Sequence, residues 1–140
     1  MRTVKELTLD ARVENISEVT AFIDAELERL DCPLKAQTQI DIAIDELFSN
    51  IAFYAYAPNV GLATVRFAYD QQSGMVSITF LDHGIPYDPL EKTDPDTTLA
   101  AEYRSVGGLG IFLVKKTMDE IQYQRCNDQN VLTIKKRIKT

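Results

Sequence analysis

The chain has 140 residues, of which 45% are hydrophobic, and its formal net charge is −6. This length and composition suffice for a buried core, so we expect one domain over residues 1–140. The acidic balance argues against a nucleic-acid-binding protein, and no stretch approaches the roughly 20 apolar residues of a membrane span. The first residues are too polar for a signal peptide, so a cytoplasmic protein is the expectation.

The first part of the chain predicts one strand and two helices. Alternation over residues 4–9 is typical of a short strand. Asn15 or Ser17 can cap a helix that continues to about residue 30, and Pro33 suits the first turn of a second helix, residues 33–56. Apolar residues in this second helix recur every three or four positions, the pattern of a core-facing stripe. These residues are Ile40, Ala43, Ile44, Leu47 and Ile51.

The second part predicts a sheet interrupted by an irregular segment. Strands are expected over residues 63–69 and 76–80, and residues 85–106 show no periodicity. A segment of that length is usually functional or disordered, and we expect a lid that nucleotide orders. A helix over residues 111–119 and strands over residues 121–126 and 131–138 follow, and a turn over residues 127–130 is expected between these two strands. This order predicts an α+β fold, a two-layer α/β sandwich in which about three helices cover one face of a mixed β-sheet.

Two polar residues of the second helix are candidates for chemistry. Glu46 and Asn50 are four apart, so their side chains are neighbours on adjacent turns. A carboxylate can accept a proton there while a carboxamide holds a cation. Taken alone, the pair is more simply interpreted as part of a solvated helix face.

A glycine-rich turn and an aspartate are further candidates. Residues 107–110 read Gly-Gly-Leu-Gly just before a helix, where backbone N–H groups and the helix dipole favour a phosphate. A flexible capping loop is an equally good interpretation of that turn. Asp82 ends a predicted strand and is followed by Gly84, so it can accept a hydrogen bond from an exocyclic amine of a flat ring. The alternative is an ordinary turn aspartate.

The order of these elements is more specific than any one of them. Glu-x-x-x-Asn on a helix, Asp-x-Gly after a strand, a lid and Gly-Gly-Leu-Gly before a helix resemble the ATP-binding fold of gyrase B, histidine kinases and mismatch-repair ATPases. Within that superfamily the chain is similar to the stand-alone anti-sigma-factor serine kinases of bacteria. The resemblance covers nearly the whole chain, including residues 86–89 and 108–119.

The resemblance implies a role for each candidate. It makes Glu46 the general base, Asn50 the Mg²⁺ ligand and Asp82 the partner of the adenine amino group. Gly84 would lie beside the adenine ring.

The remaining roles concern the phosphates and the far end of the adenine. The resemblance implies that Arg104 reaches the terminal phosphate and that Thr133 supports the adenine end. The phosphate turn itself would consist of Gly107, Gly108, Leu109 and Gly110.

The implied activity is that of a protein serine/threonine kinase that uses ATP and Mg²⁺. Its phosphoacceptor would be an antagonist protein, a sigma factor would be a second partner, and a homodimer is left open. The alternatives are a nucleotide-gated sequestering module without turnover and a plain structural domain. Two departures from the family pattern bear on the choice: Phe53 and Tyr54 stand where a polar residue is common, and Pro86 replaces a glycine.

Overall fold

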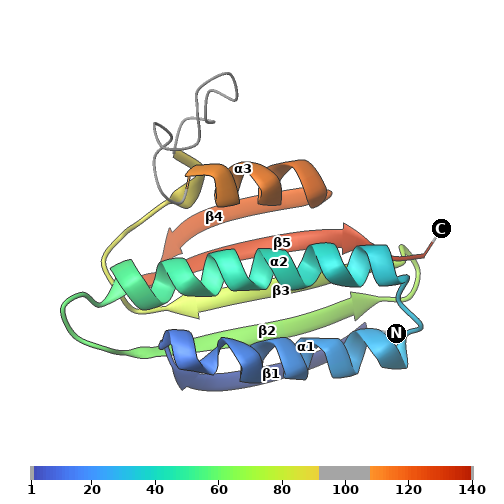
Figure 1. The fold of residues 1–140 in the computed structure, drawn as a ribbon, viewed down its shortest axis with the longest axis horizontal. Coiled ribbons are helices and arrows are strands. Elements are labelled where there is room, and N and C mark those ends of the chain that lie inside the picture. The colour runs from blue at the N-terminus through green and yellow to red at the C-terminus, as the bar shows by residue number, and fades with distance from the viewer. Residues whose placement is uncertain (1, 92–107, 140) are drawn as a thin grey trace.

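The computed structural model describes residues 2–91 and 108–139 and has the expected element order (Figure 1). The five strands are β1 (Arg2–Asp10), β2 (Leu62–Asp70), β3 (Met75–Asp82), β4 (Glu120–Cys126) and β5 (Gln129–Arg137). The helices are α1 (Ile16–Arg29), α2 (Leu34–Asn50) and α3 (Gly108–Thr117), with the short helical turns η1 (Val13–Asn15), η2 (Ile51–Ala55) and η3 (Pro89–Glu91). No helix in the described ranges is long and apolar enough to cross a membrane.

The strands form one sheet in the order β1-β2-β3-β5-β4, and the three long helices lie on one of its faces (Figure 1). The α+β class and the single helical layer are therefore confirmed. The expectation of a mixed sheet is wrong, because all four strand pairs are antiparallel. Alternation with one face buried and the other open is typical of antiparallel strands, and β2 and β3 have this pattern.

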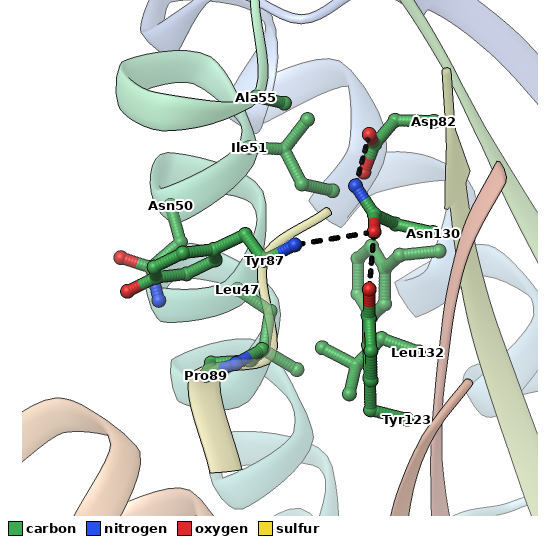
Figure 2. Close-up of a pocket in the computed structure, with 11 residues that line it drawn as sticks. Leu47, Asn50, Ile51, Ala55, Asp82, Tyr87, Pro89, Tyr123, Asn130 and Leu132 are labelled. Atoms are coloured by element: carbon green, nitrogen blue, oxygen red, sulfur yellow. Dashed lines mark hydrogen bonds between the residues drawn. The ribbon is translucent and has the colours of Figure 1, made fainter. Parts of the chain in front are cut away.

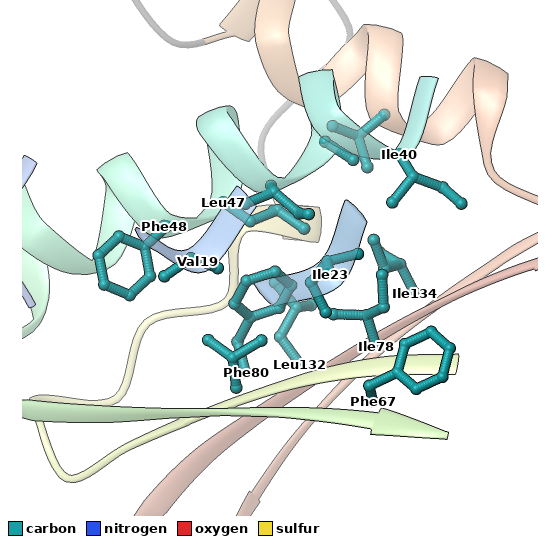
Figure 3. Packing of buried hydrophobic residues seen from close by; sticks show 14 of the residues in the cluster. Val19, Ile23, Ile40, Leu47, Phe48, Phe67, Ile78, Phe80, Leu132 and Ile134 are labelled. Carbon is teal, nitrogen blue, oxygen red and sulfur yellow. The ribbon is translucent and has the colours of Figure 1, made fainter. Parts of the chain in front are cut away.

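The core lies between the helices and the inward-facing residues of the sheet (Figure 3). The predicted stripe of α2 is buried throughout, from Ile40 to Ile51. It meets the large side chains of Phe67 and Phe80, which are each 1% exposed. Removing an aromatic side chain of this kind from water contributes roughly 1.5–3 kcal/mol. This packing fixes α2 over β3 and β5, and so it fixes the position of the polar residues on α2.

Two further expectations concern the ends of helices. Asn15 does occupy the position before α1, but its side chain donates to the carbonyl of Asp10 instead of capping the helix. The second helix extends as expected into residues 51–55, where it changes to the wider π-helical turn η2. Such turns are rare in proteins, and those that do occur are often found at functional sites. Here the turn begins directly after Asn50.

The contact between α1 and α2 contains two carboxyl groups that share a site. Asp24 on α1 and Asp41 on α2 each have a buried Oδ1 atom with no hydrogen-bond partner among the described residues. Two ionised carboxylates are both acceptors, so a hydrogen bond between these groups forms only when one of them carries a proton. Burial, that hydrogen bond and the negative charges of Asp24 and Glu28 raise the pKa of Asp41 to about 7. Burial, and then the negative charges of Asp41 and Asp24, raise the pKa of the nearby Cys32 thiol.

This pair predicts a stability that falls as the pH rises. The pKa of Asp41 is higher in the folded chain than in the unfolded chain, so its contribution is complete below about pH 4 and is lost as the pH passes through 7. After allowance for solvent screening, we expect a loss of about 1–2 kcal/mol between pH 5 and pH 8 relative to Asp41→Asn. Urea unfolding of both proteins at several pH values measures this difference. Parallel pH profiles for the two proteins would contradict the prediction.

Candidate functional site

Glu46 lies against the first turn of α3, as expected for a carboxylate beside the phosphate turn. A Cβ atom on Gly110 would overlap the Glu46 carboxylate, so only glycine permits this approach. Gly108 and Leu109 belong to the same first turn, because α3 begins at Gly108. The first N–H groups of a helix have no partners within it and form a favourable place for negative charge. Gly107 and Arg104 lie outside the described residues.

Asn50 follows Glu46 by one turn and is only 8% exposed. Its Nδ2 atom is buried and has no hydrogen-bond partner among the described residues. Leaving such an atom unpaired costs about 1–3 kcal/mol, and sites of this kind are commonly completed by water, an ion or a ligand. Because the oxygen and nitrogen of a carboxamide can exchange places by rotation, the group can present an oxygen to a hard cation such as Mg²⁺.

Asp82 lies at the end of β3 and is 4% exposed. Its Oδ1 atom accepts hydrogen bonds from the backbone N–H of Gly84 at 2.8 Å and from Nδ2 of Asn130 at 2.9 Å. A Cβ atom on Gly84 would overlap the backbone of Ala55, whose carbonyl accepts the Ile85 N–H at 2.9 Å. Gly84 is therefore required for the contact between this turn and η2. This role is separate from the expected place of Gly84 beside an adenine ring.

Asn130 is the residue of the site that the sequence did not reveal. It is 5% exposed and pairs with Asp82 across β3 and β5. The chain between β4 and β5 was expected to turn over residues 127–130. The structure has a two-residue turn in which Asn127 and Asp128 have φ angles of 52° and 61°, as in the tight hairpins that twisted strands favour. Asn130 is consequently part of β5, on the same face as Leu132.

Thr133 is not brought together with these residues. Neighbouring residues of a strand point to opposite faces, and Thr133 is an odd number of positions from Asn130. Its hydroxyl pairs with that of Thr79 at 3.1 Å on the face that the helices do not cover. The expected support of an adenine by Thr133 does not fit this geometry, and Asn130 occupies the corresponding position on the helix-facing side.

A pocket connects Asp82 and Asn130 with Asn50, and Figure 2 shows these side chains around it. Its remaining lining is largely apolar: Leu47, Ile51, Ala55, Phe80, Tyr87, Pro89, Tyr123 and Leu132. Residues 85–91, which we call the strap, run from the end of β3 across this pocket and supply Tyr87 and Pro89. The cavity volume is about 30 Å³. That is room for about two water molecules, so a nucleotide base requires the strap to move.

Contacts at Gly84, just before the strap, and at Tyr87 hold the first half of the strap. The N–H of Tyr87 donates to Oδ1 of Asn130 at 3.4 Å, and Arg125 donates to the carbonyl of Gly84 at 2.7 Å. The Tyr87 ring also packs on that of Tyr54, with centroids 5.7 Å apart and an interplanar angle of 30°. Tyr54 is thus an aromatic support of the strap, where the family pattern often has a polar residue.

These residues fit a magnesium nucleotide in their chemistry. A carboxylate suited to an exocyclic amine lies at one end of an apolar pocket, and a carboxamide with an unsatisfied atom lies at the other. The first turn of a helix, which attracts phosphate, meets Glu46 beside that carboxamide. Apolar walls with a few convergent polar groups are typical of small-molecule sites.

Comparison with known proteins supports this interpretation. Residues 9–136 match the family model described as the histidine kinase-like ATPase domain. The chain is 28% identical over 95 residues to the serine/threonine-protein kinase BtrW of Bordetella bronchiseptica, an alignment that covers 68% of this chain and 66% of that protein. It is 26% identical over 134 residues to the serine-protein kinase RsbW of Bacillus cereus, covering 93% of this chain and 82% of that protein.

Solved structures share the fold. The chain matches a crystal structure of the RsbU and RsbW domains of Rv1364c from Mycobacterium tuberculosis with a TM-score of 0.70 and 19% identity, over 97% of this chain and 32% of that one. It also matches the histidine kinase domain of the blue-light-activated histidine kinase EL346 from Erythrobacter litoralis, with a TM-score of 0.51 and 19% identity. That match covers 76% of this chain and 46% of the other. The chain therefore corresponds to about a third of the crystallised Mycobacterium chain and to less than half of the histidine kinase domain.

Proposed function

Because the chain belongs to the histidine kinase-like ATPase domain family, we propose that it binds ATP with Mg²⁺ and phosphorylates a serine or threonine of a partner protein. The observation that carries the proposal is the contact between the Glu46 carboxylate and Gly110 in the first turn of α3, with Asn50 one helical turn away. A proton acceptor, a cation ligand and a phosphate-attracting helix end then surround one point. Phosphoryl transfer needs such positioning and charge neutralisation more than covalent chemistry.

Each residue has a defined task in this proposal. Asp82 accepts a hydrogen bond from the adenine amino group, and the N–H groups at the start of α3 meet the phosphates. Asn50 holds Mg²⁺ through its side-chain oxygen, and the remaining ligands would be water and phosphate, as this ion prefers. Glu46 accepts the proton of the incoming hydroxyl group. ATP supplies the phosphoryl group that is transferred.

We further propose that the acceptor is a small antagonist protein and that a sigma factor is a second partner. Support for this comes from the resemblance to anti-sigma-factor kinases and from relatives named as serine-protein kinases. The RsbW domain in the Mycobacterium structure, which is joined to an RsbU domain, is consistent with a role in such a regulatory system. Incubation of the chain with labelled ATP and products of neighbouring genes tests the acceptor directly.

Asn50→Ala separates nucleotide binding from folding. We expect the affinity for ATP in Mg²⁺ to fall about 10-fold or more, because the cation loses a protein ligand. The stability without nucleotide should not fall, since the substitution removes an unsatisfied buried atom. Calorimetric titration with and without Mg²⁺, together with thermal unfolding, measures both effects.

The neighbouring Ser49→Ala is the matched control for that substitution and should retain the parent affinity. If Asn50→Ala bound ATP as tightly as the parent in Mg²⁺, Asn50 would not be the cation ligand. If neither the parent nor Asn50→Ala bound any adenine nucleotide, the proposed function itself would be wrong.

A further inference from the structure

Asn130 makes four hydrogen bonds that use the whole capacity of its carboxamide, and Figure 2 draws those with Asp82, Tyr87 and Tyr123. Its Nδ2 donates to Oδ1 of Asp82 at 2.9 Å and to the carbonyl of Ile85 at 2.8 Å. Its Oδ1 accepts the N–H of Tyr87 at 3.4 Å and the hydroxyl of Tyr123. A backbone carbonyl can only accept and a backbone N–H can only donate, so the carboxamide has one allowed orientation.

This orientation determines which atom of Asp82 is available. Oδ1 accepts two N–H groups, from Gly84 and from Asn130. No donor among the described residues reaches Oδ2, although Asp82 lines the pocket. The carboxylate is therefore held through one oxygen and offers the other. A buried side chain fixed in this manner does not have to reorganise when a ligand arrives.

The same carboxamide also holds the strap. Ile85 and Tyr87 are two positions apart in the strap, and each contributes one backbone group to Asn130. Tyr87 and Pro89 in turn lie over the pocket (Figure 2). The side chain of Asn130 on β5 thus contacts both Asp82, the proposed acceptor of the base, and the strap, which closes over the pocket.

We propose that Asn130 is a positioning residue that orients Asp82 for the base and latches the strap over the pocket. The inference rests on the proposed binding of an adenine nucleotide. Asn130 acts through Asp82 and through residues 85–87, and it does not need to contact the nucleotide itself. Loss of Asn130 should therefore weaken discrimination between bases and shorten the residence time of the bound nucleotide.

The test compares Asn130→Ala with Thr133→Val, a substitution on the same strand but on the opposite face of the sheet. Association and dissociation rates of ATP and GTP are measured by stopped flow with fluorescent analogues. We expect Asn130→Ala to speed ATP dissociation about 10-fold or more and to reduce the ATP/GTP preference by a similar factor. Thr133→Val should leave both unchanged. Equal losses for ATP and GTP would overturn the proposal.

A double-mutant cycle with Asp82→Asn identifies the route of the effect. If Asn130 acts through Asp82, Asn130→Ala should change the ATP/GTP preference less than about threefold in the Asp82→Asn background. The full effect in that background would show that Asn130 has only a structural role, and the proposal would fail.

Asn130→Asp keeps the size of the side chain and covers the case in which Asn130→Ala fails to fold. Two carboxylates would then face each other, which raises the pKa of the pair. Once protonated, the new carboxyl group can again donate to Asp82. We expect the ATP/GTP preference to be poor at pH 8 and to recover several-fold towards pH 5.5, with no such change in the parent. A preference that does not depend on pH would contradict the proposed orientation of Asp82.

Amide exchange of Tyr87 tests the latch without any nucleotide. Its N–H donates to Oδ1 of Asn130, and Asn130→Ala removes that acceptor, so the Tyr87 N–H should exchange at least several-fold faster in Asn130→Ala than in Thr133→Val. Unchanged exchange would overturn the latch. If the parent bound no nucleotide but exchange still changed, the proposed function would be wrong while the latch remained.

Discussion

Replacing Glu46 by Gln is expected to abolish most phosphoryl transfer while leaving the binding of ATP with Mg²⁺ nearly intact. Gln has the size of Glu and keeps its packing against Gly110, but it cannot accept a proton. A positioned general base contributes roughly 10²–10⁴-fold to the rate, so transfer to the acceptor should fall by that factor. Incorporation of labelled phosphate into the acceptor measures transfer, and a parallel titration measures binding.

Asp45→Asn is the matched control, because Asp45 is the adjacent residue on α2 and is exposed. It removes the same charge without reaching the site, and it should transfer phosphate at the parent rate. Equal transfer by the parent and by Glu46→Gln would exclude Glu46 as the base. If the parent bound ATP but transferred to none of the acceptors tested, a sequestering module would be the better description of the chain.

The sequence predicted the parts of the fold that depend on local patterning. The stripe of α2 from Ile40 to Ile51 is buried as its spacing indicates, and the strands have the expected alternation. Strand direction was not predicted correctly, although the alternation of β2 and β3 is typical of antiparallel strands with one open face, whereas parallel strands buried on both faces read as continuous apolar runs. The end of the helical segment formed by α2 and η2 was predicted to within one residue. The change to the π-helical turn at residues 51–55 depends on contacts with Gly84 and Ile85, which lie far away in the sequence.

The site residues likewise divide into those that local sequence patterns predicted and those that they did not. Glu46, Asn50 and Asp82 were found because each belongs to a motif whose spacing follows one helix or one strand end. Thr133 was chosen by residue type, and the alternation of β5 directs it to the other face of the sheet. Asn130 was assigned to a turn, and only the two-residue turn at Asn127 and Asp128 moves it into β5. Strand parity counted from Leu132 and Ile134 would have selected it.

Closure of the pocket by the strap could not have been predicted from composition. Pro86, Tyr87 and Pro89 suggest an irregular segment, but its path is set by the carbonyl and N–H groups that Asn130 contacts. Those contacts join residues more than 40 positions apart, and no local pattern encodes them. The contact between the rings of Tyr87 and Tyr54 also joins residues that are distant in the sequence, so no local pattern predicts it.

Asp82→Asn is expected to reverse the preference for the base. The Oδ1 position of residue 82 receives two N–H donors, so the new carboxamide must place its oxygen there and its nitrogen towards the ligand. A donor then faces the amino group of adenine, which is also a donor, whereas guanine presents a carbonyl oxygen at the same position. Loss of one charged hydrogen bond costs about 1.5–3 kcal/mol, so ATP affinity should fall by roughly 10–100-fold while GTP affinity is maintained or rises.

The control for this reversal is Asp70→Asn, which makes the same chemical change at the opposite end of the β2–β3 hairpin. Asp70 accepts hydrogen bonds from the backbone N–H of Gln72 and the hydroxyl of Ser73, far from the pocket along the strand. Competition between ATP and GTP for each variant gives the preference directly. Because the Gly84 N–H alone still requires an oxygen at the Oδ1 position, the reversal should persist to within about threefold in the Asp82→Asn, Asn130→Ala double variant. An unchanged ATP/GTP ratio in Asp82→Asn would mean that Asp82 does not read the base.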